Sequence, residues 1–203
     1  IVWESPFKSA MTNGLAIFAL AQMLEFTDKP QTYLDTIECA VKAFQYDVSD
    51  DVVSSITDEY LWFEEYAMES RSKVLNGGLF ALSGIWVAKK YLNSSVADQL
   101  FEQMVDAVEL RINEYDAGHT SLYHSVPVTG KYVDFGRPVH GSYNAIHALQ
   151  LLWLYSETGR QIFWDYARKF YGYERYEITQ VLKNSEALTK QTDLYKYHYY
   201  DVF

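Results

Sequence analysis

Two adjacent carboxylates, Glu64 and Glu65, stand among three aromatic residues in the segment WFEEY. An aromatic setting raises the pKa of a carboxyl group toward neutrality, because desolvation disfavours the charged form. Aromatic rings also offer flat apolar surfaces against which a sugar ring can lie. The segment therefore predicts acid/base chemistry on a carbohydrate.

Residues 52–66 around this pair are rich in β-branched and aromatic side chains, which predicts an extended segment or a hairpin. Successive side chains of a strand point to opposite faces, so only one of the two carboxylates can face a given cleft. The other is then a solvated or salt-bridged residue. The local pattern alone does not choose between Glu64 and Glu65.

Further candidates stand in an expected loop and at two expected helix starts. Tyr123 follows a turn, and an unperturbed phenol titrates near pH 10, so it serves as a proton donor more readily than as a base. Tyr143 and His147 are one helical turn apart and could form a wall of the site. Asn76-Gly77-Gly78 is interpreted mainly as a helix start with Asn as its cap, and alternatively as an anion-binding helix end.

Metal and thiol chemistry find little support in the sequence. His119 and His124 are five residues apart without a third ligand at a recognisable spacing, so no metal site is expected. Cys39 is the single cysteine, which excludes an internal disulfide framework and a thiolate metal site. We expect no cofactor.

The charge balance restricts the partners. The chain has 17 basic and 27 acidic residues, a formal charge of −10, which argues against non-specific nucleic-acid binding. An anionic ligand would need a local basic cluster, such as Arg71 with Lys73, or Lys131 with Arg137. No apolar run reaches the roughly 20 residues that span a bilayer. The chain begins at Ile1 without Met, so we interpret it as part of a longer or processed protein.

Helical periodicity dominates the rest of the chain. The helices are expected over about residues 12–26, 31–45, 78–91, 96–115 and 143–155, with another beginning at Arg160. Residues 116–141, with four Gly and two Pro, predict a long loop. Paired helices with short links predict an all-α fold that forms an (α/α) toroid or barrel. We expect this toroid to be incomplete or a single-domain fragment, with the hairpin and the long loops at one end. Residues 1–173 would form this domain, and residues 174–203 an unassigned tail.

Several motifs, in this order, resemble the C-terminal domain of the heparan sulfate/heparosan D-glucuronyl C5-epimerase family. They are an SP-x-x-S run reaching Gly14, WFEEY followed by SKVLNGGLFALSGIW, YDAGHTSLY, and a Y-x-x-x-H start to an LQLL helix. The match extends roughly from Trp3 to Phe170. The chain departs from the family pattern at Gly141-Ser142, before the helix tyrosine, and at His124-Ser125, after SLY.

The resemblance implies an (α/α) barrel and a catalytic set of Glu65, Tyr123 and Tyr143. Epimerisation at C5 of a uronate removes a proton α to a carboxylate and returns one to the opposite face, so it needs two acid/base groups. An anionic polysaccharide is the implied substrate, and the Golgi lumen is the implied compartment if the source is eukaryotic. The candidates for substrate binding are Tyr66, Arg71, Lys73, Asn76, Arg137 and His147. A homodimer is left open.

Three alternatives remain. A polysaccharide lyase would form the same carbanion and expel the C4 substituent, giving an unsaturated uronate. A glycoside hydrolase would need two carboxylates about 5 to 10 Å apart. A non-catalytic carbohydrate-binding domain would keep the aromatics without turnover.

Overall fold

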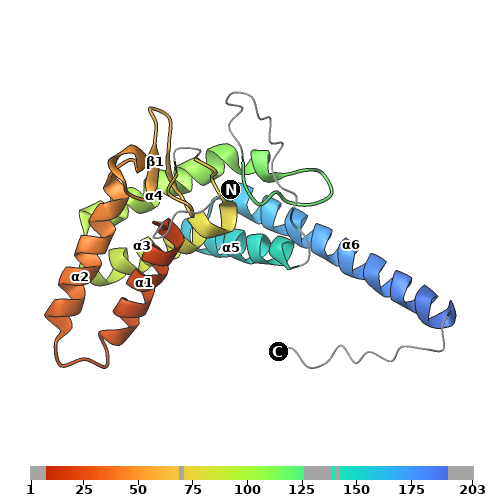
Figure 1. Cartoon of the computed structure of the whole chain (residues 1–203), viewed down its shortest axis with the longest axis horizontal. Coiled ribbons are helices and arrows are strands. Elements are labelled where there is room, and N and C mark those ends of the chain that lie inside the picture. The colour runs from red at the N-terminus through yellow and green to blue at the C-terminus, as the bar shows by residue number, and fades with distance from the viewer. Residues whose placement is uncertain (1–7, 69–70, 126–138, 140–141, 192–203) are drawn as a thin grey trace.

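The computed structural model describes residues 8–68, 71–125, 139 and 142–191. Within them the chain is mainly helical with one short antiparallel hairpin (Figure 1). The elements are α1 (Ala10–Met23), α2 (Pro30–Lys42), η1 (Ala43–Gln45), η2 (Val48–Asp50), β1 (Ser54–Ile56), β2 (Leu61–Phe63), α3 (Leu75–Leu92), α4 (Ser95–Arg111), η3 (Ile112–Tyr115), α5 (Tyr143–Thr158) and α6 (Gln161–Gln191). The predicted helical class and hairpin are confirmed. The helix pairs are compatible with a toroid, whose closure stays a prediction.

The helices begin and end somewhat differently from the sequence expectation. The Ser9 hydroxyl caps α1 by accepting from the Thr12 amide at 3.3 Å, so this helix starts earlier than predicted. The predicted Asn76 cap is wrong, because α3 begins at Leu75 after an extended Val74 that makes no side-chain cap. α6 continues without interruption past residue 173, where the sequence pattern weakens.

Helix α3 is the central element, and α1 crosses it with backbone contact. A Cβ added to Gly14 would lie 2.5 Å from the Ala81 Cα, and one added to Gly84 would collide with the Gly14 carbonyl. The two helices therefore approach as closely as glycine permits. This crossing buries Ile17, Ala21, Leu82 and Ile85 in a core shared with α2 and α4.

The hairpin pairs Ser54 with Phe63 and Ile56 with Leu61. Both Trp62 and Phe63 are fully buried, so β2 has no solvent face, and it ends before the two carboxylates. An antiparallel β-bridge between Val74 and His124 joins the start of α3 to the loop after α4. The hairpin and this loop consequently lie near the N-terminal end of α3 (Figure 1).

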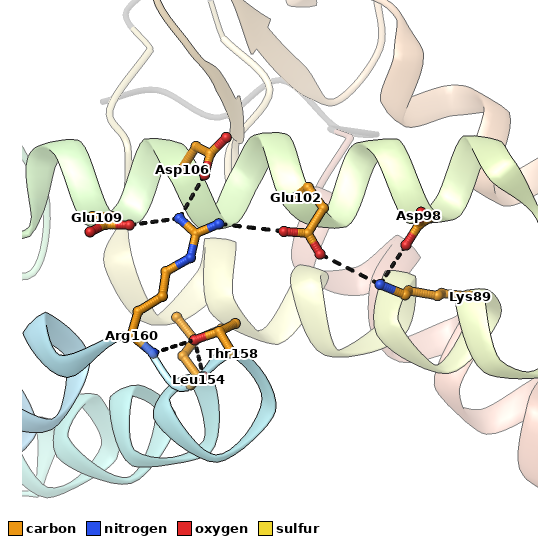
Figure 2. Close-up of polar contacts among 8 residues, drawn as sticks. All are labelled: Lys89, Asp98, Glu102, Asp106, Glu109, Leu154, Thr158 and Arg160. Carbon is orange, nitrogen blue, oxygen red and sulfur yellow. Dashed lines mark hydrogen bonds and ion pairs between the residues drawn. The ribbon is translucent and has the colours of Figure 1, made fainter.

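Helices α5 and α6 form an antiparallel pair that is fastened to α4 by charge. Arg160, at the turn between them, binds Asp106 and Glu109, each at 2.6 Å, and Glu102 at 3.4 Å (Figure 2). Lys89 of α3 shares Glu102 from the other side, at 3.5 Å. A network of this kind holds its members better than isolated surface pairs do. It fixes the α5–α6 turn against α4.

Helix α5 is apolar along most of its length but is buried on one face only. Its inner face carries Leu151 and Leu154, both fully buried, whereas Leu149 is 67% exposed.

No helix in the described ranges is long and apolar enough to cross a membrane.

Replacing Gly84 by Ala is expected to lower the free energy of unfolding by about 2–3 kcal/mol, since the new methyl group overpacks a backbone contact. Gly172→Ala in α6 is the matched control, because its Cβ would meet nothing within 4 Å. That substitution should raise stability by about 0.5–1 kcal/mol through helix propensity. Urea unfolding measures both, and equal effects would contradict the close crossing.

Candidate active site

Glu65, Tyr66 and Tyr123 form a hydrogen-bonded cluster at the N-terminal end of α3. The Tyr123 hydroxyl donates to Glu65 Oε1 at 3.1 Å, and the Tyr66 and Tyr123 hydroxyls are also 3.1 Å apart. The Tyr143 ring packs edge-on against Tyr123 with 5.6 Å between ring centres. The three residues predicted as catalytic thus come together from segments far apart in the sequence. Their catalytic role stays a prediction.

Glu65 is 5% exposed and lies directly against the first turn of α3. A Cβ on Gly77 would stand 2.5 Å from the Glu65 Cβ and 2.8 Å from its Cδ, so only glycine fits there. The partial positive charge of a helix N-terminus favours a carboxylate in this position. Among the described residues, Glu65 Oε2 has no hydrogen-bond partner. This oxygen is buried against Gly77 in the first turn of α3.

Glu64 points the opposite way and has a structural role. It is fully buried, and it accepts from the Ser55 hydroxyl at 2.6 Å and from the Lys73 amide at 2.9 Å. Burial raises the pKa of Glu64, and these two hydrogen bonds offset only part of the shift. The Tyr115 hydroxyl donates to the Lys73 carbonyl at 2.6 Å. Glu64 and Tyr115 together fix the backbone from which α3 begins.

The tyrosines of the cluster are held in their neutral form. Burial raises the pKa of Tyr123, and the neighbouring Tyr66 and Glu65 raise it further. Burial also raises the pKa of Tyr66. At neutral pH both phenols therefore keep their protons and act as hydrogen-bond donors.

Helix α5 supplies one face of the site. Tyr143, His147 and Gln150 follow one another at i, i+4 and i+7 and so share that face. His147 is fully buried with Nδ1 2.8 Å from the Ser121 hydroxyl, and Gln150 Nε2 donates to the Asn76 carbonyl at 3.0 Å. Burial lowers the pKa of His147 to about 3, so this imidazole is neutral.

Asn144 is a site residue that the sequence analysis missed. Its Oδ1 accepts from the Ser121 amide at 2.8 Å and from the Ser121 hydroxyl at 2.7 Å. Its Nδ2 donates to the Thr120 hydroxyl at 3.2 Å. These bonds anchor the segment that carries Tyr123 to the first turn of α5. The available signal was an amide side chain next to Tyr143, in the first turn of a mainly apolar helix.

The predicted basic residues occupy other surroundings. Arg71 pairs with Asp47 at 2.8 Å and donates to the Ile56 carbonyl at 3.3 Å, on the hairpin side. Lys73 is buried, with Nζ 3.4 Å from the Arg71 carbonyl and 5.5 Å from the centre of the Tyr60 ring. None of these four contacts involves the cluster. Arg137 and Lys131 lie outside the described residues.

No cluster of three or more His, Cys, Asp or Glu side chains capable of holding a metal occurs within the described residues. Cys39 is exposed on α2. A hollow of about 400 Å³ lies between the hairpin turn and α4, lined in part by Tyr60, Gln99 and Gln103. Its lining residues do not include Glu65 or its tyrosine partners.

The family model described as D-glucuronyl C5-epimerase C-terminus matches residues 3–172. The chain belongs to this family. It is 30% identical over 146 residues to an uncharacterised protein of Methanocaldococcus jannaschii, covering 69% of this chain and 44% of that protein. It is 26% identical over 190 residues to a D-glucuronyl C5-epimerase of Caenorhabditis elegans, covering 85% of this chain and 30% of that protein. The chain thus spans less than half the length of either curated relative.

Replacing Glu64 by Gln tests the buried carboxyl. The pKa of Glu64 is 4.5 in its ordinary setting and higher in the folded protein, so the unfolded chain loses this proton first as the pH rises. The free energy of unfolding of the native protein should therefore fall as the pH rises from 4.5 toward the pKa of the folded state. Gln cannot lose a proton, so the variant should gain stability relative to the wild type over this rise in pH. Urea unfolding between pH 4 and 8 measures the difference. Glu59→Gln, at an exposed position, is the control, and equal pH dependence in both variants would contradict this account.

Proposed function

We propose that this chain is the helical part of an enzyme that converts D-glucuronyl units of a polysaccharide into L-iduronyl units by epimerisation at C5. The observation that carries the proposal is the contact of Glu65 with Tyr123, with Tyr143 packed against Tyr123. Family membership and the name of the nematode relative support the reaction class. The substrate and the roles of the residues below are part of the proposal.

Glu65, as a carboxylate, takes the C5 proton. The electron pair of the broken C–H bond moves into the uronate carboxyl group, which gathers negative charge in the transition state. Tyr123, kept neutral by its raised pKa, donates a hydrogen bond to Glu65 in the resting site. In the reaction its proton stabilises the charge that develops beside it, as preorganised donors do in other active sites.

The second proton must come from the opposite face of the sugar. Glu65 and its hydrogen-bonded partner Tyr123 act on the first face, and Tyr143, which α5 supplies, acts on the second. Tyr143 is 37% exposed at the start of α5 and can reach a ligand that rests on Tyr123. Its hydroxyl gives a proton to C5, which leaves a phenolate. The proton held on Glu65 restores this phenolate after product release, so the enzyme returns to its starting state.

The lyase alternative shares the first step and differs in the fate of the carbanion. A glycoside hydrolase needs a second carboxylate across the scissile bond. Glu64, the neighbour of Glu65, is buried against Ser55 and Lys73, so it does not supply that group. This observation favours carbanion chemistry over hydrolysis.

Glu65→Gln in the full-length protein is expected to lower the exchange of the C5 hydrogen with solvent deuterium by about 10²–10⁴-fold, the usual loss of a general base. Binding of the polysaccharide should persist, because Gln has nearly the same shape. NMR of glucuronyl oligosaccharides incubated in D₂O measures the exchange. Glu59→Gln, on the exposed hairpin turn, should exchange normally.

Unchanged exchange in Glu65→Gln would remove Glu65 from the mechanism. Formation of an unsaturated uronate with chain shortening by the unmodified protein would select the lyase. Binding without any C5 exchange in the unmodified protein would favour the non-catalytic domain.

A further inference from the structure

The face of α5 that carries Tyr143, His147 and Gln150 touches the cluster at one end and the first turn of α3 at the other. Tyr143 packs against Tyr123, and Gln150 bonds to the Asn76 carbonyl, which immediately precedes Gly77 beneath Glu65. His147 lies between these two contacts on the same face. Its ring lies 6.3 Å from the Tyr143 ring and 6.2 Å from the Phe170 ring of α6, measured between ring centres, and its Nδ1 lies 2.8 Å from the Ser121 hydroxyl of the Tyr123 segment.

The hydrogen bonds around His147 determine its tautomer. The Ser121 amide can only donate, so the Asn144 atom 2.8 Å from it is the amide oxygen. The Ser121 hydroxyl lies 2.7 Å from the same oxygen and must donate its one proton there. Its oxygen can then only accept from His147 Nδ1 at 2.8 Å. His147 thus carries its proton on Nδ1, and Nε2 is a bare acceptor.

The same reasoning fixes Gln150. Its amide faces the Asn76 carbonyl at 3.0 Å, and a carbonyl only accepts, so the facing atom is Nε2. Gln150 Oε1 is therefore an acceptor on the other side of the amide. His147 Nε2 and Gln150 Oε1 are both buried and, among the described residues, without a hydrogen-bond partner. Glu65 Oε2 is a third acceptor in the same condition.

We propose that His147 Nε2 and Gln150 Oε1 form a hydroxyl-binding subsite for the sugar ring beside Glu65. This subsite rests on the proposed function and extends it, because it names the substrate groups that α5 recognises. Buried acceptors left unpaired are costly, and sugar hydroxyls are the donors that satisfy them. A uronate carboxylate has no proton to offer at neutral pH, so it must lie away from this face. The subsite thus orients the ring with its hydroxyl edge toward α5.

The first experiment tests the tautomer of His147 and does not depend on catalytic activity. In full-length protein labelled with ¹⁵N-histidine, NMR should show His147 with a protonated Nδ1 and a bare Nε2, unchanged from pH 5 to 8, since burial keeps its pKa far below this range. A glucuronyl oligosaccharide at saturation should shift the Nε2 resonance toward that of a hydrogen-bonded nitrogen. A proton on Nε2 in the free protein, or an Nε2 signal unmoved by bound oligosaccharide, would overturn the proposal.

The second experiment measures the steady-state kinetics of the His147→Asn variant. The amide of the new Asn can still donate to Ser121, but the Nε2 acceptor is lost. We expect KM to rise about tenfold with kcat little changed, as for the loss of one hydrogen bond to a bound ligand. His119→Asn, the same change at an exposed histidine, should leave both constants unaltered. No C5 exchange in the unmodified protein would contradict the proposed function. Normal exchange with an unchanged KM in His147→Asn would contradict the subsite alone. If His147→Asn fails to fold, the NMR arm decides.

Discussion

The packing of Glu65 against Gly77 is the constraint on which the candidate site depends. The absence of a side chain at Gly77 lets the Glu65 carboxyl approach the first turn of α3, where the helix dipole favours its charge. Glu64, one residue earlier, is held on the other side by Ser55 and Lys73. The two adjacent carboxylates thus have different surroundings: Glu64 fixes the start of the helix, and Glu65 accepts from Tyr123 in the tyrosine cluster.

The rest of the molecule brings the partners of Glu65 to this point. Asn144 and His147 bond to Ser121, which places Tyr123 two residues further along the same segment. The α5–α6 pair that carries these side chains is fastened to α4 through Arg160. The site is therefore built from three separate parts of the sequence, which hydrogen bonds and ion pairs between distant residues hold together.

Local patterns predicted the elements, and the family resemblance predicted which residues would meet. The hairpin and most helices followed from residue spacing, and Glu65, Tyr123 and Tyr143 do lie together. The start of α3 was misplaced because the buried Glu64–Lys73 contact, not an Asn cap, sets it. Arg71 could not be placed from its charge, since its partner Asp47 is distant in sequence. Such long-range pairs leave no periodic signal, and Asn144 was missed for the same reason.

The most direct test of this account is C5 hydrogen exchange in full-length protein carrying Gly77→Ala. The added methyl group would occupy the space of the Glu65 side chain without removing any catalytic candidate. We predict a protein that retains its helical circular dichroism and loses C5 exchange by about 100-fold or more, as for a misplaced catalytic group. A folded Gly77→Ala variant with normal exchange would contradict the claim that the packing of Glu65 against Gly77 positions this carboxylate for catalysis.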